Sequence, residues 1–134
     1  MVNNNKKGDD CMYYSGKGSN CLYEVRRGDI YFVNLGGNEN KGSEQKGLRP
    51  CVVVQNDTGN KFSKNIIVVP MTTKDKHKLP THVNLSLKGT PSTVLCECMR
   101  TVSKERITEF VCCIDDATMK KIDTALLVSL GLDK

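Results

Sequence analysis

Short apolar runs separated by polar loops most constrain the fold of this chain. They lie at 28–35, 49–55 and 65–71, and each holds at least three consecutive apolar residues. Runs of this length, bounded by segments rich in glycine, asparagine and aspartate, are typical of buried strands. The sequence therefore predicts a protein built mainly from closely spaced strands.

Two further strands are predicted downstream. In the segment 81–87 apolar and polar residues alternate, which predicts apolar side chains on the core face and His82 on the solvent face. The segment 93–102 is predicted as a single strand, with Cys96 and Cys98 on one face beside Val94.

The last segment has the spacing of a helix of about four turns. Asp115 or Asp116 can cap its N-terminus, and Gly131 suits its end. The apolar residues at helical spacing are Met119, Ile122, Leu126 and Leu130. The predicted fold is mainly β, a small and strongly bent antiparallel barrel with a C-terminal helix packed on it.

One domain fits the length of 134 residues. Residues 1–23 are rich in asparagine, glycine, serine and lysine, and we expect them to form a flexible N-terminal extension. The folded domain is predicted over residues 24–134.

Charge and cysteine content limit the partners and the compartment. The net charge of +5 favours an anionic partner, although an ordinary basic surface has the same signature. No run reaches the ~18 apolar residues of a membrane helix, and no secretory signal is visible. The seven cysteines are therefore expected as reduced thiols in a cytoplasm. Since no C-x2-C pair is present, we expect neither a metal site nor a cofactor.

Two side chains at predicted strand ends could bind a phosphate. Pro50 biases Arg49 to an extended conformation at the mouth of the second strand, where a guanidinium can grip phosphate oxygens. Thr72 follows the third strand, and its hydroxyl can donate to such an oxygen. The alternatives are an exposed or Glu44-paired arginine and a threonine that only completes a turn.

The loops that contain these residues carry an excess of cations. If both loops lie on one side of the barrel, they form a positive cleft; otherwise they are solvated lysine clusters. The cations are Lys41, Lys46 and Arg49 in the first loop and Lys74, Lys76 and Lys78 in the second. A two-histidine nuclease mechanism is disfavoured, because His77 lies in an unconstrained loop and His82 on a strand.

Six segments, in order from about Val25 to Leu132, carry a family pattern: "RRGDIYFVNL", "GSEQKGLRPCVVVQNDTGNKFS", "IIVVPMT", "LPTHVNL", "ECMRTVSKERI" and "MKKIDTALLVSLGL". Together they resemble the MazF/PemK family of toxin endoribonucleases. The resemblance implies an SH3-like (PemK/CcdB-like) barrel, a homodimer, and metal-independent cleavage of single-stranded RNA at a short sequence.

The same resemblance implies roles for individual residues. It makes Arg49 and Thr72 the catalytic pair. The residues implied to bind RNA are Ser43, Glu44, Gln45, Lys46, Asn56, Thr73, Lys74, His82 and Arg100. It also implies a MazE-type antitoxin whose acidic C-terminal tail occupies the RNA groove. Cys98 departs from the glutamine that family members often carry, and it cannot replace the hydrogen bonds of an amide.

For the chemistry, we expect the RNA 2′-OH to attack the adjacent phosphorus, giving a 2′,3′-cyclic phosphate and a 5′-OH end. The proton acceptor is left open between Glu44 and the substrate itself. Two other functions compete: a CcdB-like gyrase poison, disfavoured because the chain has no tryptophan, and a small-barrel nucleic-acid-binding module without catalysis.

Overall fold

The computed structural model describes residues 24–37, 42, 45–74 and 78–133. The prediction for residues 1–23 lies outside these ranges. The strands are β1 (Asp29–Asn34), β2 (Leu48–Val53), β3 (Asn65–Thr72), β4 (His82–Leu87), β5 (Thr90–Leu95), β6 (Arg100–Ser103) and β7 (Ile107–Cys113). The helices are α4 (Asp57–Phe62) and α5 (Asp116–Ser129), with 3₁₀ turns η2 (Cys96–Cys98) and η3 (Lys104–Arg106).

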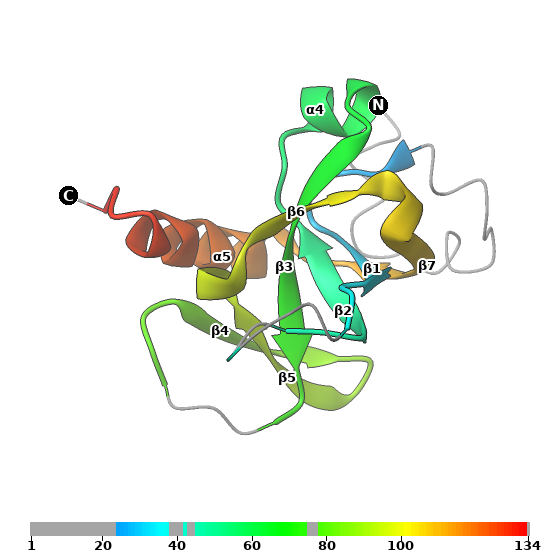
Figure 1. Ribbon diagram of the computed structural model, residues 1–134. Coiled ribbons are helices and arrows are strands. Elements are labelled where there is room, and N and C mark those ends of the chain that lie inside the picture. Colours follow the sequence, from blue (N-terminus) through cyan, green and yellow to red (C-terminus); the bar gives the residue numbers. More distant parts are fainter. Residues whose placement is uncertain (1–23, 38–41, 43–44, 75–77, 134) are drawn as a thin grey trace.

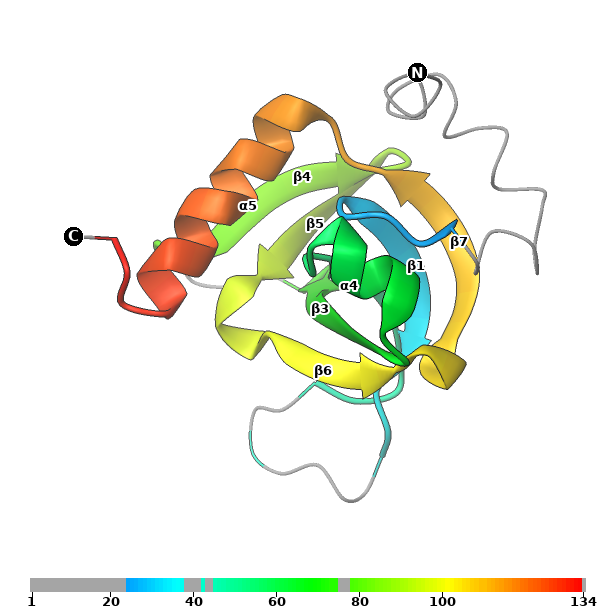
Figure 2. The same cartoon turned by 90° about the horizontal axis from the view of Figure 1, so that it is seen from above.

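The strands form one antiparallel sheet that curls on itself, as Figure 2 shows from above. Their order is β4-β5-β3-β2-β1-β7, and β6 also pairs with β3. The eight-residue β3 is the junction of this sheet, because β2, β5 and β6 all pair with it. The predicted bent antiparallel barrel with a C-terminal helix is confirmed.

Both faces of the central strands are buried, which explains their unbroken apolar runs. One face includes Val52 and Val69, and α5 covers it with Ile122 and other apolar side chains. The opposite face includes Val53 and Val68, packed with Tyr31 and Phe110 among others. Figure 1 shows α5 at the side of the sheet and α4 at its upper end.

The C-terminal helix begins and ends close to its predicted limits. Asp115 is the N-cap, and its carboxylate accepts a hydrogen bond of 2.7 Å from the Thr118 amide. Gly131 has φ = 72°, the left-handed conformation expected just beyond a helix end. Of the four apolar residues at helical spacing, Leu130 lies just beyond the helix, which ends at Ser129, and is 54% exposed. Ala125 is buried in the same core.

The segment predicted as one strand over 93–102 is two strands joined by η2. β5 pairs with the Thr72 end of β3 and with β4, whereas β6 pairs with the Asn65 end of β3. The chain must change position in the sheet between these partners, and η2 makes that change. Cys96 and Cys98 therefore do not share a strand face.

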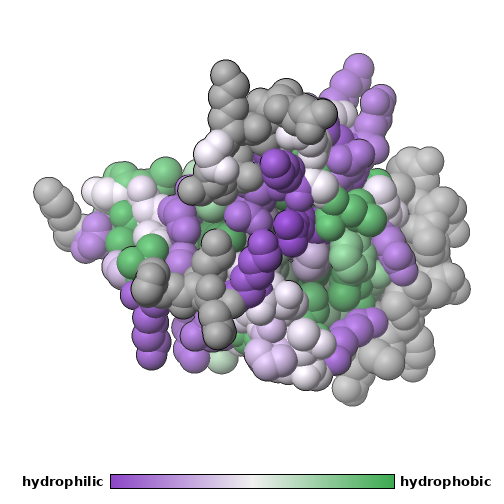
Figure 3. Space-filling view, turned by 60° about the horizontal axis from the view of Figure 1, so that its bottom comes forward, coloured by the Kyte–Doolittle hydropathy of each residue, from purple (hydrophilic) through white to green (hydrophobic). Residues whose placement is uncertain are grey.

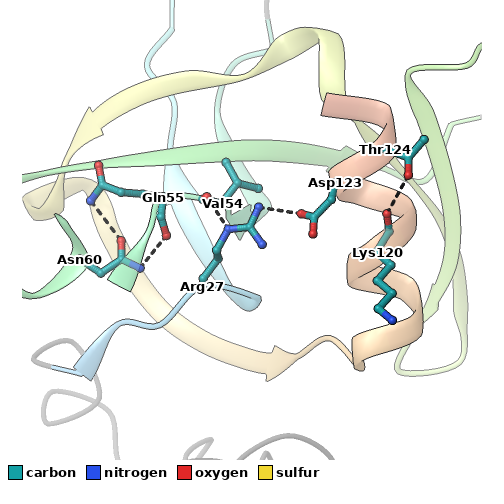
Figure 4. Close-up of polar contacts among 7 residues, drawn as sticks. All are labelled: Arg27, Val54, Gln55, Asn60, Lys120, Asp123 and Thr124. Atoms are coloured by element: carbon teal, nitrogen blue, oxygen red, sulfur yellow. Dashed lines mark hydrogen bonds and ion pairs between the residues drawn. The ribbon is translucent and has the colours of Figure 1, made fainter. Parts of the chain in front are cut away.

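A hydrogen-bonded cluster fixes α4 and links both helices to the chain that enters β1 (Figure 4). The Asn60 amide donates to the Gln55 carbonyl at 2.9 Å, and the Gln55 amide donates back to Asn60 Oδ1 at 3.1 Å. Arg27 Nε donates to the Val54 carbonyl at 2.8 Å, and its Nη2 lies 2.7 Å from Asp123 Oδ1 on α5. Arg27 thus joins the end of β2 to α5.

The cysteines only partly match expectation. Cys51, Cys96 and Cys112 are free thiols, whereas Cys113 is disulfide-bonded, contrary to the expectation of reduced thiols throughout. Among the described residues, no group of three or more His, Cys, Asp or Glu side chains could hold a metal ion. In the same ranges, no helix has the length and apolar character needed to cross a membrane.

Candidate functional site

A cavity of about 460 Å³ opens at the end of the sheet where β2 begins and β3 ends. Figure 3 shows apolar surface bordered by hydrophilic side chains on the face that contains this end. The apolar side chains that line the cavity are Phe32, Leu48, Pro50, Met71, Leu87, Phe110 and Val111. The polar ones are Arg49, Thr72, Thr73, Lys88, Thr90, Ser92 and Glu109.

The cavity forms because β2 and β3 separate at this end. The ladder between them runs from Val53↔Val68 to Cys51↔Pro70 and then stops. Continuing that register by two residues would set Arg49 opposite Thr72. β3 instead turns towards β5, and Thr72 pairs with Thr93. The two predicted catalytic side chains therefore flank the gap between diverging strands.

Arg49 is the second residue of β2 and is half-buried. Its Nε donates to the Lys46 carbonyl at 3.0 Å, which ties the guanidinium to the preceding loop. Within the described ranges no carboxylate pairs with it, so its terminal nitrogens can bind an anion. The predicted alternative, an ion pair with Glu44, falls on a residue outside these ranges.

Thr72 is only 4% exposed, so its hydroxyl is held in one place at the cavity wall. Oγ1 accepts a hydrogen bond of 3.2 Å from the Lys74 amide, which is the turn role considered above. That bond uses an oxygen lone pair and leaves the hydroxyl proton for a ligand. Turn formation and ligand binding are therefore compatible at this residue.

A second arginine lies near the first. Arg100 begins β6, and its Nη1 donates to the Gln45 carbonyl at 3.4 Å. Burial raises the pKa of Cys51 to about 12, an effect that the positive charges of Arg100 and Arg49 partly oppose. Both guanidinium groups thus lie around one buried thiol, and Cys51 is a neutral core residue. The structure brings Arg49, Arg100 and Gln45 together.

Other predicted RNA-binding residues divide between the cavity and its surroundings. Thr73 lines the cavity, and the exposed Lys74 follows it in the chain. Lys46 is exposed and contacts Arg49 through its carbonyl. Ser43 and Glu44 lie outside the described residues.

Asn56 lies at the other end of the sheet. Its side chain caps α4 by accepting a hydrogen bond of 2.8 Å from the Gly59 amide. It follows Arg49 by seven positions along and just beyond β2, which corresponds to about 23 Å of extended chain. Within one chain it does not contribute to the cavity.

His82 is also separate from the cavity, and the prediction that it faces solvent is wrong. Its side chain is 6% exposed, and its Nε2 lies 2.9 Å from Glu97 Oε2. Thr81 donates to the other oxygen of Glu97 at 2.9 Å. Burial tends to raise the pKa of Glu97, but hydrogen bonds from His82, its own backbone and Thr81 outweigh this effect and lower it. His82 instead lines a second hollow of about 420 Å³ beside α5.

The sequence did not predict the part of the cavity wall that β4, β5 and β7 contribute. Lys88 and Gly89 have φ values of 49° and 86°, as in a tight hairpin turn, and this turn brings Lys88 and Thr90 to the cavity. The "LKGT" turn was visible in the sequence, but its position was not. Glu109 comes from β7, a strand that the sequence analysis did not identify.

The chain is similar to known proteins over most of its length. A family model described as PemK-like, MazF-like toxin of type II toxin-antitoxin system matches residues 26–130. Endoribonuclease EndoA of Bacillus subtilis is 45% identical over 113 residues, and the match covers 81% of this chain and 96% of the relative.

Solved structures show the same fold. An endoribonuclease in complex with its cognate antitoxin, from a mycobacterial species, is 28% identical with a TM-score of 0.69, covering 81% of this chain and 96% of that one. MazF from Deinococcus radiodurans is 23% identical with a TM-score of 0.70, covering 81% and 98%.

Proposed function

The chain belongs to the family of PemK-like, MazF-like toxins of type II toxin–antitoxin systems, and on this premise we propose that it is a sequence-specific endoribonuclease that cleaves single-stranded RNA. The observation that supports this most directly is the position of Arg49 and Thr72, which line one cavity from two diverging strands. The relative from Bacillus subtilis is itself named an endoribonuclease.

The chemistry follows from the donors at this cavity. RNA carries its own nucleophile, so the enzyme has to align the 2′-OH with the phosphorus and stabilise the charge that develops on the phosphate oxygens. Arg49 supplies charged donors on a side chain held by the Lys46 carbonyl. The buried Thr72 hydroxyl fixes a phosphate oxygen. Arginine is too basic to accept the 2′-OH proton at neutral pH, so its role is charge stabilisation.

The cavity also supports a proposal for how RNA is read. Lys88 and Lys46 add positive charge near Arg49, whereas the floor is apolar and includes Phe32 and Phe110. A phosphate at the cationic rim would put an unpaired base against that floor, where its edges can meet Ser92 and Thr90. Arg100 and Gln45 extend the polar rim towards β6.

We also propose that the protein acts in the cytoplasm as a homodimer and is inhibited by a MazE-type antitoxin. The mycobacterial and Deinococcus relatives have been solved with antitoxins. An acidic antitoxin tail complements the same cations that would bind RNA. RNA and antitoxin would then compete, and adding the antitoxin tail should raise the KM for RNA.

The test is to incubate the purified protein with a long single-stranded RNA and to map the cut ends. We expect cuts at one short sequence, with 5′-OH and cyclic phosphate ends, in the presence of EDTA. Arg49→Ala should abolish cleavage, whereas Lys120→Ala, which removes an exposed lysine of α5, should not. A 2′-deoxy nucleotide at the scissile position should block cutting.

Three results would contradict the proposal. They are no cleavage by the unmodified protein, cleavage by Arg49→Ala at the wild-type rate, and efficient cutting of the 2′-deoxy substrate.

A further inference from the structure

An aromatic side chain is exposed at the end of the molecule opposite the cavity. Phe62 is the last residue of α4 and is 75% exposed. The ammonium group of Lys61 lies 5.3 Å from the centre of its ring. Large exposed apolar residues are common one at a time, so exposure alone decides nothing. The charge around this ring is what distinguishes it.

Two more lysines lie beside this helix end. Lys64 is exposed, and its carbonyl accepts a hydrogen bond of 2.9 Å from the Lys104 amide. The Lys104 ammonium donates to the Asn60 carbonyl of α4. These contacts tie Lys104 to the helix that carries Phe62. We call Lys61, Phe62, Lys64 and Lys104 the α4 platform.

Among the described residues, the acidic side chains near this helix end do not cancel its charge. Asp57 lies at the other end of α4, where its carboxylate accepts hydrogen bonds from the Arg27 amide and the Asn60 side chain. Glu105 follows Lys104 in η3, where Arg106 offsets it. The three lysines of the platform therefore leave a positive surface around an open aromatic ring.

A polar strand runs between the cavity rim and the platform. β6 begins at Arg100, which contacts Gln45, and ends next to Lys104. Between them Thr101 is exposed and Ser103 is half-buried. Figure 2 shows β6 along one border of the curled sheet, and β3 is its pairing partner. Four residues of extended chain correspond to about 13 Å.

We propose that the α4 platform is a second contact site for single-stranded RNA, in which a base outside the cleaved sequence stacks on Phe62 and the lysines hold the adjoining phosphates. The proposal rests on the proposed function, because it concerns the same RNA. Aromatic rings beside lysines bind single strands without regard to sequence, because every base has a stacking face. RNA fits better than a protein partner, because the surface offers one ring among cations and not an apolar groove.

The test measures binding of fluorescein-labelled oligouridylates, one short and one long enough to span cavity and platform, by fluorescence anisotropy at several salt concentrations. We expect Phe62→Ala to weaken binding of the long oligouridylate by about 5- to 150-fold. Phe62→Trp keeps a stacking face and should restore the affinity for the long oligouridylate. In the double variant Lys61→Ala/Lys64→Ala, the slope of log K against log salt concentration should become shallower by about 0.7 for each lysine removed.

Leu132→Ala and Lys120→Ala are matched controls, since they remove an exposed apolar residue and an exposed lysine elsewhere. Light scattering and circular dichroism check that every variant keeps the oligomeric state and fold of the wild type. The proposal is overturned if Phe62→Ala binds the long oligouridylate as Leu132→Ala does. It is also overturned if the double lysine variant keeps the wild-type salt slope.

Failure of this proposal can be told from failure of the proposed function. If the unmodified protein cleaves a long RNA at a defined sequence while Phe62→Ala has the wild-type KM for it, only the platform is excluded. If the unmodified protein does not cleave RNA, the proposed function itself fails.

Discussion

Replacing Arg27 by alanine should destabilise the protein mainly through one hydrogen bond rather than through the ion pair that accompanies it. Arg27 Nε donates to the Val54 carbonyl, and Nη2 pairs with Asp123 (Figure 4). Val54 is 8% exposed, so water has little access to the carbonyl that the change leaves unpaired. A hydrogen bond with a charged partner contributes about 1.5–3 kcal/mol. Arg27 is itself partly exposed, so the lower half of that range applies.

The ion pair should contribute much less. The side chains of Arg27 and Asp123 are 32% and 45% exposed, so solvent and salt screen their attraction to about 0.5 kcal/mol. Arg27→Ala should therefore cost about 2 kcal/mol in total, and Asp123→Ala about 0.5 kcal/mol. Arg27→Lys keeps a charge near Asp123 but lacks Nε, so it should recover less than half of the loss.

Urea unfolding followed by circular dichroism, at one fixed protein concentration, measures these free energies. With a slope near 2 kcal/mol per molar urea, the Arg27→Ala midpoint should fall by about 1 M. The double mutant with Asp123→Ala gives the coupling energy directly. The reasoning is refuted if Asp123→Ala costs as much as Arg27→Ala, or if Arg27→Ala shifts the midpoint by less than a quarter of the expected amount.

Two more predictions concern the cavity and the His82 pair. Thr72→Val keeps the shape of the side chain but removes the hydroxyl, so kcat for RNA cleavage should fall by about 100-fold or more; an unchanged kcat would remove Thr72 from the proposed chemistry. The lowered pKa of Glu97 means that its carboxylate stabilises the fold above its ordinary pKa of 4.5 and loses that contribution as pH falls further. The difference in unfolding free energy between wild type and Glu97→Gln should therefore shrink in acid, and a difference that grows on acidification would contradict this assignment.

The sequence revealed two kinds of strand. In β2 and β3 the valine and isoleucine runs, bounded by polar loops, predicted strands that agree with the structure. In β4 the alternation of apolar and polar residues did the same. The strand β7 escaped because its apolar residues do not alternate: Ile107 is followed by two exposed residues and then by Phe110 and Val111. Its pairing with β1 shifts register twice, so local pattern and buried face no longer coincide.

The break between β5 and β6 was hidden for a different reason. The segment around Cys96 has the composition of a strand, and only the positions of its partners in the sheet require a turn there. His82 illustrates the same limit. Alternation could not reveal that Glu97 contacts the His82 ring and that this side chain is buried. Residue patterns indicate which side of a strand is polar, whereas tertiary contacts determine whether that side is exposed to solvent.

The pairing of the first described strand with the last has a consequence for synthesis. Asp29 of β1 pairs with Cys113 of β7. The second side of β1 can therefore pair only after almost the whole chain has been synthesised. β3 likewise gains β5 and β6 only after residues 90–103 have been made. Such non-local pairing makes folding slow and late relative to elongation. We therefore expect the nascent chain to leave the ribosome before its cavity is complete. This delay gives an inhibitory partner time to bind the protein before the protein can act on its substrate.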